Sequence, residues 1–350
     1  MWTVRFLGIV LTLSLAVACE SPQQEPKAHN DPSRYSLAED VLWASPGGFD
    51  LTMDVYTPVG DNGPYPVLMI FHGGGWLIND KSIMDQMAQY IATNGEYVVC
   101  NVDYRLLADQ ANTVTVDQII GDVVGSVLWV KERISQYGGD PTQLAVTGDS
   151  AGAHLSAAVV NLGNRLSAEP YSEENLAFKP SYLPAAMTAQ QVADSHGVEV
   201  QAALLSYGAF DLYGLGEGDF ESWKNPFWYL GGVLPRGIFG DAYNAQTHPG
   251  LYKGVSPLHN VPLSSERLLP PQLLTVGTDD TLTTPAMVQA YLQKLRDAGQ
   301  RAEYWEYQGK GHAFLDSRDS FAADAPPALD VMLNFLDRVF YPQTESRCRQ

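Results

Sequence analysis

The chain has 350 residues, 45% of them hydrophobic, and carries a formal net charge of −19. A chain of this length and apolar content can bury a large core, as one large α/β domain or as two smaller ones, which excludes extensive disorder. Nucleic-acid binding depends on clusters of Lys and Arg, and the sequence has none, so its composition argues against nucleic acid and anionic membranes as partners. We therefore expect a small uncharged substrate and not a polyanion. The acidic surface is otherwise typical of a soluble protein or of one from a salty habitat.

The N-terminus has the pattern of an export signal. Residues 6–18 form an apolar run behind Arg5 that is too short to span a bilayer, and small residues typical of a cleavage site end at Ala18. Cys19 follows directly, as in the lipobox of bacterial lipoproteins, where this cysteine is acylated. We therefore predict a signal peptide over residues 1–18 and a lipoprotein facing the periplasm or the cell surface. Simple cleavage after Ala18, giving a secreted protein, is the competing interpretation.

Composition also divides the rest of the chain. Residues 19–40 are polar and contain Pro, Gln and Asn, which is typical of a tether that holds a domain off a surface. Residues 41–342 alternate short β-branched runs with longer helical periods. This pattern predicts an α/β domain with a mostly parallel sheet covered on both faces by helices.

Strand-like and helix-like segments follow one another along this domain. The expected strands are residues 51–56, 66–71, 97–102, 144–146, 200–205, 272–276 and 302–307. The expected helices are residues 84–93, 119–134, 153–162, 285–298 and 327–340. The first strand alternates polar and apolar residues, as an edge strand does, whereas the second is almost wholly apolar, as expected at the centre of a sheet. Cys100 lies in the third strand and is expected to be a packed core thiol, with a disulfide to Cys348 as the alternative.

A Gly-x-Ser-x-Gly motif stands at residues 148–152, between an apolar strand and a helical segment. In such a nucleophile elbow the serine lies on a sharp turn, and the glycines leave room for a strained backbone and an approaching substrate. An ordinary Gly-Ser turn is the alternative. The flanking strand and helix favour Ser150 as a nucleophile.

Residues 72–76 read His-Gly-Gly-Gly-Trp and directly follow the second expected strand. The loop after an early strand supplies oxyanion-hole amides in enzymes with this elbow. Ester hydrolysis places negative charge on the former carbonyl oxygen, which fixed N–H donors stabilise. We assign these donors to Gly74, Gly75 and Ala151. The rival interpretation, a phosphate-binding loop, lacks the required Lys and Ser/Thr ending.

Ser150 requires a base, and His312 is the best placed of the seven histidines. It lies in a Gly-Lys-Gly-His loop directly after the expected strand 302–307 and ahead of the last helix. His72 belongs to the glycine loop, and His154 lies on the helix after the nucleophile, where packing is its expected role. The others lie in the tether, or in or beside long insertions, without motifs.

The third member of such a site is a carboxylate that comes between the serine and the histidine in the chain. Residues 277–282, Gly-Thr-Asp-Asp-Thr-Leu, follow an expected strand and satisfy this order. Their position alone leaves both Asp279 and Asp280 as candidates.

Two long segments, residues 163–199 and 212–269, interrupt the alternation of strands and helices. Long insertions in compact domains are commonly lids or binding loops, so we expect the second to cap the active site. Trp223 and Trp228 from this insertion, with Trp76, are the expected lining of an apolar pocket. The alternative is that the aromatic side chains of the insertion only pack against the helices of the sheet.

With these motifs, about residues 50–340 resemble the hormone-sensitive-lipase-like and bacterial feruloyl-esterase-like carboxylesterases of the α/β-hydrolase superfamily. The resemblance rests on residues 72–76, 103–106 (Asp-Tyr-Arg-Leu), 148–155, 277–282 and 311–314. In proteins that it resembles, the acid stands shortly after a glycine and two residues before Leu or Val, which implies Asp280. The family's oxyanion glycines correspond to Gly74 and Gly75, which implies a structural role for His72.

The resemblance implies hydrolysis of carboxylic esters through an acyl-enzyme intermediate, without a cofactor. The sequence also lacks the His-Glu-x-x-His or clustered Cys and His spacing of a metal site, so no metal is expected. Short-acyl esters, aryl esters and acylated sugars are all candidate substrates, because the insertions lie where the substrate is selected. An amidase or arylformamidase with the same triad is the nearest alternative. A surface-tethered binding protein that has lost activity is a rival from another class.

Overall fold

The computed structural model describes residues 30–195 and 198–342, and a single eight-stranded sheet forms their centre. The strands lie in the order β1-β2-β4-β3-β5-β6-β7-β8. Their bounds are β1 (Tyr35–Ala44), β2 (Leu51–Pro58), β3 (Tyr65–Phe71), β4 (Val98–Val102), β5 (Gly139–Asp149), β6 (Ala202–Ser206), β7 (Gln272–Gly277) and β8 (Ala302–Tyr307). The pairs β1/β2 and β2/β4 are antiparallel and the other neighbours are parallel, which confirms the predicted mostly parallel sheet.

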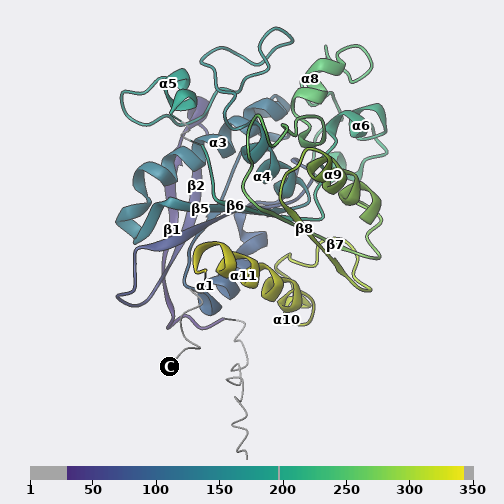
Figure 1. Cartoon of the computed structure of the whole chain (residues 1–350). Helices are drawn as coiled ribbons and strands as arrows, with labels where there is room; N and C mark the ends of the chain where they lie inside the picture. The colour runs from purple at the N-terminus through teal and green to yellow at the C-terminus, as the bar shows by residue number, and fades with distance from the viewer. Residues whose placement is uncertain (1–29, 196–197, 343–350) are drawn as a thin grey trace, which may run out of the picture.

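Helices cover both faces of this sheet (Figure 1). On one face lie α1 (Asp85–Asn94) and α11 (Pro326–Phe340), and on the other lie α3 (Val116–Arg133), α4 (Ala151–Leu162) and α9 (Pro285–Asp297). Shorter helices occupy the connections: η1 (Pro46–Gly48), η2 (Lys81–Met84), α2 (Asp109–Asn112), η3 (Ile134–Tyr137), α5 (Ala189–Asp194), α6 (Leu212–Glu217), α7 (Pro226–Leu230), α8 (Pro249–Gly254), η4 (Pro257–His259) and α10 (Phe321–Asp324). Because both faces are covered, β3 and β4 are buried along their whole length, which explains their apolar sequences.

The edge of the sheet differs from the prediction. β2 is not an edge strand, because β1 pairs with it on the outer side. The predicted tether over residues 19–40 is therefore too long, since its last six residues belong to β1. β1 is an edge strand and buries few of its side chains, so apolar residues such as Leu37 and Leu42 are exposed. Tyr35 and Trp43 are among the few that it buries. Ser36, Glu39 and Asp40 in its first half continue the polar composition of the predicted tether.

The register of the parallel strands brings their carboxyl ends to one edge of the sheet. Gly148 of β5 lies opposite Phe71 of β3, and Gly277 of β7 lies opposite Tyr307 of β8. The segments that follow these strands contain every predicted catalytic motif. Parallel α/β sheets bind ligands at this edge, so the fold places the motifs where a site is expected.

The chain runs into the domain at the opposite edge. Asn30 Nδ2 donates to Gln89 Oε1 at 3.0 Å, and the Asp31 amide donates to Thr93 Oγ1 at 3.0 Å. Both partners lie on α1, whose last turn precedes the amino end of β4. The predicted signal peptide, residues 19–29 of the tether with Cys19, and Cys348 lie outside the described residues.

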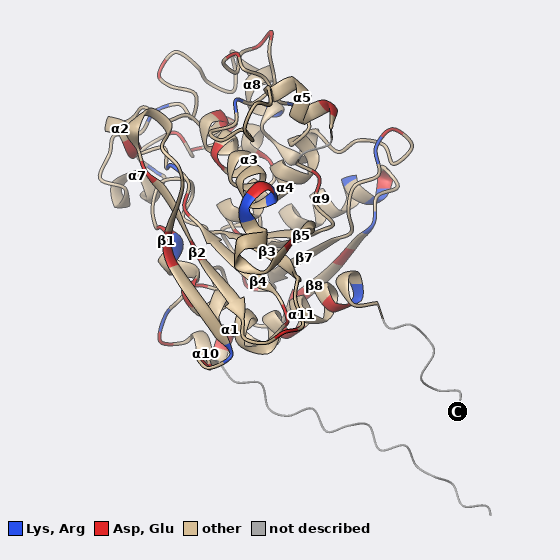
Figure 2. Ribbon diagram, turned by 90° about the vertical axis from the view of Figure 1, so that its left-hand side faces the viewer, with Lys and Arg blue, Asp and Glu red and all other residues tan. Residues whose placement is uncertain are grey.

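Acidic and basic residues are dispersed over many elements of the domain (Figure 2). Within the described part of the chain, no helix has both the length and the apolar character needed to cross a bilayer. Cys100 is buried in β4, as predicted, and burial raises the pKa of its thiol.

Candidate active site

Ser150, His312 and Asp280 form one chain of hydrogen bonds at the carboxyl edge of the sheet. Ser150 follows β5, Asp280 follows β7 and His312 follows β8. Nε2 of His312 lies 3.0 Å from Oγ of Ser150, and Nδ1 of His312 lies 2.8 Å from Oδ2 of Asp280. These distances are within the reach that a general base and its orienting carboxylate require.

The structure distinguishes the two candidate carboxylates. Asp280 is 3% exposed, and its Oδ1 accepts hydrogen bonds of 2.9 Å from the amides of both Leu282 and Thr283. Burial alone would raise the pKa of Asp280, but contact with His312 and these amides lowers it below the ordinary value. Asp279 is exposed, and its carboxylate accepts a hydrogen bond from the Thr278 hydroxyl at 3.2 Å. Asp280 is therefore the acid that contacts the histidine.

Thr283 is a member of this site that sequence reasoning missed. Its Oγ1 donates to the carbonyl of Tyr207 at 2.7 Å and lies 3.1 Å from Nδ1 of His312 and 3.2 Å from Oδ2 of Asp280. Because its own proton is directed to the carbonyl, the hydroxyl oxygen can accept from the imidazole N–H. Its position three residues after Asp280 is the one signal that the sequence offers.

The predicted nucleophile lies on a strained turn. Ser150 has φ +50° and ψ −114°, and its amide donates to the Ser206 carbonyl at 2.9 Å. A Cβ at Gly152 would lie 1.9 Å from the Phe71 carbonyl oxygen, and one at Gly148 would lie 2.4 Å from the Gly152 backbone. Both glycines are therefore required for the close approach of α4 to the end of β3.

The glycine loop lies beside the nucleophile. Gly74 has φ +117° and Gly75 has φ +60°, and a Cβ at Gly74 would lie 2.2 Å from the Ile78 carbonyl oxygen. Gly75 and Ser150 line the same pocket, and Ala151 is the first residue of α4, where backbone amides have no partner within the helix. Two of the three predicted oxyanion donors, Gly75 and Ala151, thus lie beside Ser150.

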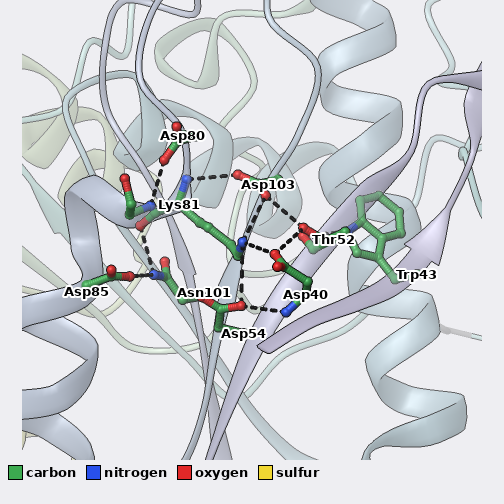
Figure 3. A network of polar contacts seen from close by, with 10 residues as sticks. Asp40, Trp43, Thr52, Asp54, Asp80, Lys81, Asp85, Asn101 and Asp103 are labelled. Carbon is green, nitrogen blue, oxygen red and sulfur yellow. Dashed lines mark hydrogen bonds and ion pairs between the residues drawn. The ribbon is translucent and has the colours of Figure 1, made fainter. Parts of the chain in front are cut away.

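An ion-pair network around Lys81 holds η2, the short helix that follows the glycine loop, to strands at the edge of the sheet. Nζ of Lys81 lies 2.6 Å from Asp40 of β1, 3.5 Å from Asp54 of β2 and 3.6 Å from Asp103, which follows β4. Figure 3 shows Lys81 pointing among these carboxylates. Burial alone would lower the pKa of Lys81, but the carboxylates raise it well above its ordinary value. No sequence motif indicated this network.

The Asp-Tyr-Arg-Leu motif supports the same loop. Tyr104 stacks on the buried His72 ring with centroids 4.3 Å apart and donates to the His72 carbonyl. Arg105 makes an ion pair with the buried Asp122 at 2.7 Å. Burial lowers the pKa of His72, so this histidine is a packed neutral group, in agreement with the structural role that the resemblance implies.

A pair of carboxyl groups lies close to the site. Asp149, which precedes the nucleophile, is buried, and both burial and the charge of Asp316 raise its pKa well above the ordinary value. Burial raises the pKa of Asp316 to about 6, although Arg318 and His312 oppose the shift. The environment of the triad therefore favours the protonated form of Asp149 and makes Asp316 easier to protonate than an ordinary aspartate.

A pocket of about 300 Å³ opens at Ser150. It is lined by residues that include Gly75, Trp76, Leu215, Phe220, Phe227 and Met287. Segments of the second insertion thus contribute to its wall, as expected of a cap. A larger hollow of about 960 Å³ lies near the C-terminal end of α4, and its lining contains none of the predicted site residues.

Of the three tryptophans expected in the pocket, Trp76 lines the cavity at Ser150, whereas Trp223 and Trp228 lie elsewhere. Trp223 is 67% exposed and lies in a separate surface groove with Tyr229 and Leu234. Trp228 is fully buried, and its indole N–H donates to the Phe220 carbonyl at 2.7 Å. Trp228 thus packs inside the insertion, because α7 directs this side chain inward, and phenylalanines of the insertion line the pocket instead.

Comparisons with known proteins agree with this geometry. A sequence profile described as the alpha/beta hydrolase fold matches residues 68–316. The chain is 28% identical over 289 residues to Esterase LipQ of Mycobacterium tuberculosis, a match that covers 80% of this chain and 58% of that protein. It is 35% identical over 123 residues to Carboxylesterase NlhH of the same species, which covers 35% of this chain and 37% of that protein. The chain thus spans about half the length of these relatives.

Solved structures also share the fold. Thermogutta terrifontis esterase 2 phosphonylated by sarin matches 87% of this chain and 97% of its own, with a TM-score of 0.64 and 21% identity. The apo form of the same esterase matches with a TM-score of 0.63 and 20% identity, over 90% of this chain and 98% of its own.

Proposed function

The chain belongs to the α/β-hydrolase family, and from this premise we propose that it is a serine carboxylesterase acting on small uncharged esters. The observation that carries the proposal is the continuous hydrogen-bond chain from Ser150 through His312 to Asp280, next to a glycine loop and a pocket. The named esterases among its relatives support the same chemistry.

In the proposed reaction, Oγ of Ser150 attacks the ester carbonyl while Nε2 of His312 takes its proton. The amides of Gly74, Gly75 and Ala151 hold the negative oxygen of the tetrahedral intermediate. His312 then returns the proton to the departing alcohol. A water molecule, activated by the same histidine, releases the acid and regenerates the serine.

Two acceptors at Nδ1 prepare His312 for this role. The carboxylate of Asp280 and the hydroxyl of Thr283 both face Nδ1, which favours the tautomer with its proton on that nitrogen. The lone pair of Nε2 then faces Ser150. The lowered pKa of Asp280 keeps this group ionised and able to stabilise the imidazolium.

The pocket supports a small acyl or aryl group as the part of the substrate next to Ser150. Its volume of about 300 Å³ is at the lower limit for small-molecule sites, and most of its lining is apolar. The charged residues Asp219 and Lys224 at its rim pair with each other at 3.0 Å, so they offer no uncompensated charge to the substrate. Short-acyl esters, aryl esters and acylated sugars, including those of feruloyl-esterase type, all belong to this proposed class.

The cellular place of the protein is a separate proposal. We propose export by the signal over residues 1–18 and lipidation of Cys19, on the sequence pattern described above. Intact-mass measurement of the protein from the membrane fraction should reveal acyl chains on an N-terminal Cys19. An unmodified mature protein in the medium would instead establish simple cleavage.

The proposed activity is tested with a series of p-nitrophenyl esters from acetate to palmitate, using the wild type and Ser150→Ala side by side. We expect hydrolysis that is fastest for short chains and is lost in Ser150→Ala, with both proteins folded. An aryl amide and an N-aryl formamide are included, because the same triad cleaves those bonds. A folded wild type that cleaves amides and no ester would favour the amidase alternative, and one inactive on all of these compounds would favour a binding role.

A further inference from the structure

His154 links three parts of the site. It lies on α4 one turn after the nucleophile, with its amide 3.2 Å from the Ser150 carbonyl, and it is fully buried. Its Nδ1 lies 3.2 Å from Nε1 of Trp76, which belongs to the glycine loop. Its Nε2 lies 2.8 Å from the carbonyl oxygen of Val255, which follows α8 in the second insertion. One imidazole therefore contacts the glycine loop and the insertion from the nucleophile's own helix.

These partners define the protonation state of His154. An indole N–H can only donate, and a carbonyl oxygen can only accept. Nδ1 must therefore present a lone pair to Trp76, and Nε2 must carry the proton that it donates to Val255. Burial lowers the pKa of His154 to about 4, so the neutral form that this arrangement needs persists at neutral pH.

Trp76 needs such a restraint because its backbone is strained. Its φ of +59° is rare for a bulky residue, and such a conformation persists only where the surroundings hold it. The Leu107 amide donates to the Trp76 carbonyl at 2.7 Å. The indole ring makes edge contacts with His154 and Phe220, with centroids 5.1 Å and 5.5 Å apart. The hydrogen bond from the indole to His154 holds the side chain itself.

We propose that His154 is a positioning residue that holds Trp76 in its strained conformation and thereby sets the adjoining Gly75 amide and one wall of the pocket. Trp76 directly follows Gly75, so relaxation of the strained residue would rotate the peptide units of the glycine loop. The same ring lines the pocket at Ser150. This role rests on the proposed esterase activity.

The test compares His154→Phe with His154→Asn. Phenylalanine keeps a ring of similar size but accepts no hydrogen bond, whereas the Oδ1 of asparagine stands near the place of Nδ1 and can accept from Trp76. We expect His154→Phe to lower kcat on p-nitrophenyl acetate by about tenfold to a hundredfold with little change in KM, because small misplacements of catalytic groups cost this much. We expect His154→Asn to keep kcat within about threefold of wild type, since it retains the acceptor.

Removing the donor provides a second test if His154→Phe does not fold. Trp76→Phe keeps an aromatic wall and loses the N–H, so kcat should fall by about tenfold or more. The double variant should be no slower than the slower single variant, because both changes remove the same interaction. Trp43→Phe is the matched control. This buried tryptophan also donates, to the Thr52 carbonyl at 3.2 Å, but it belongs to the edge strand β1 and does not line the pocket at Ser150.

Nuclear magnetic resonance separates this inference from the proposed function. In ¹⁵N-labelled protein, His154 should show a protonated Nε2 and an unprotonated Nδ1, and the Trp76 indole proton should move upfield in His154→Phe. If the wild type shows these signals but hydrolyses no ester, the restraint on Trp76 is supported and the esterase proposal is overturned. The positioning role would be overturned if the Trp76 indole resonance did not move in His154→Phe. It would also be overturned if both His154→Phe and Trp76→Phe kept the kcat of the wild type.

Discussion

The hydroxyl oxygen of Thr283 lies 3.1 Å from Nδ1 of His312, which is the nitrogen that also faces Asp280. Thr283→Val keeps the shape of the side chain and removes this acceptor. We expect kcat on p-nitrophenyl acetate to fall by about threefold to tenfold, because a hydrogen bond of about 1 kcal/mol is lost where charge develops on the imidazole. Thr283→Ser should restore most of the rate. Equal rates for Val and wild type would show that the carboxylate alone orients the histidine.

The two neighbouring aspartates should differ sharply in their effect on catalysis. Asp280→Asn removes the charge that faces His312 and favours the wrong tautomer, so kcat should fall by about a thousandfold to ten thousandfold. Asp279→Asn alters an exposed group and should leave kcat within about twofold of wild type, since such surface changes have small effects. Steady-state kinetics on one ester suffices, with circular dichroism as the check on folding. A large loss in Asp279→Asn would contradict the assignment.

Lys81 should matter for stability more than an ordinary surface lysine. Lys81→Met leaves Asp40, Asp54 and Asp103 without their shared cation, and we expect the free energy of unfolding to fall by about 3 kcal/mol. Lys310→Met breaks a more exposed pair with Asp324 and should cost at most about 1 kcal/mol.

Urea denaturation measures both of these variants. The pH is held near neutral, where the carboxylates are charged. Adding Asp54→Asn to Lys81→Met should recover part of the loss, because it removes one of the repelling charges. A similar small cost for both lysine variants would show that the network contributes no more than a surface pair.

Asp316 should make stability depend on pH. Its pKa is raised from 3.8 to about 6, so the folded state binds this proton more tightly than the unfolded state does. The stability that the folded state gains by binding this proton is complete below the ordinary pKa of an aspartate and is lost as the pH rises through about 6. Asp316→Asn keeps the group neutral at all pH values. The variant should therefore gain stability relative to wild type as the pH rises, by at most about 3 kcal/mol.

Urea unfolding of both proteins at about pH 4.5 and about pH 7.5 checks this expectation, because the two values bracket most of the shift. A stability difference that stays constant between the two pH values would contradict the role assigned to Asp316.

The sequence indicated the triad and the glycine loop because their chemistry constrains the local backbone. Ser150 needs glycines at residues 148 and 152 for the close approach of α4 to β3, and such a requirement is visible as a short motif. The strands at the centre of the sheet were predictable for a related reason. Burial on both faces demands long apolar runs, as in β3.

Features that depend on contacts between distant segments could not be predicted in this way. The first six residues of β1 fall in the predicted tether, because Ser36, Glu39 and Asp40 continue the polar composition of the residues before them. The carboxylates around Lys81 come from three separate segments of the chain, and no spacing in the sequence relates them. The expectation that Trp223 and Trp228 line the pocket rests on residue type alone, whereas α7 directs Trp228 into the insertion and Trp223, which precedes α7, is exposed.

The contacts of Asn30 and Asp31 with α1 have a consequence for orientation. They hold the start of the domain at the edge with the amino ends of the parallel strands, whereas Ser150 and its pocket lie at the carboxyl edge. An enzyme held to a membrane through the proposed lipid on Cys19 would be attached on the side of the domain opposite its pocket. Ester substrates would then approach Ser150 from the side that faces away from the point of attachment.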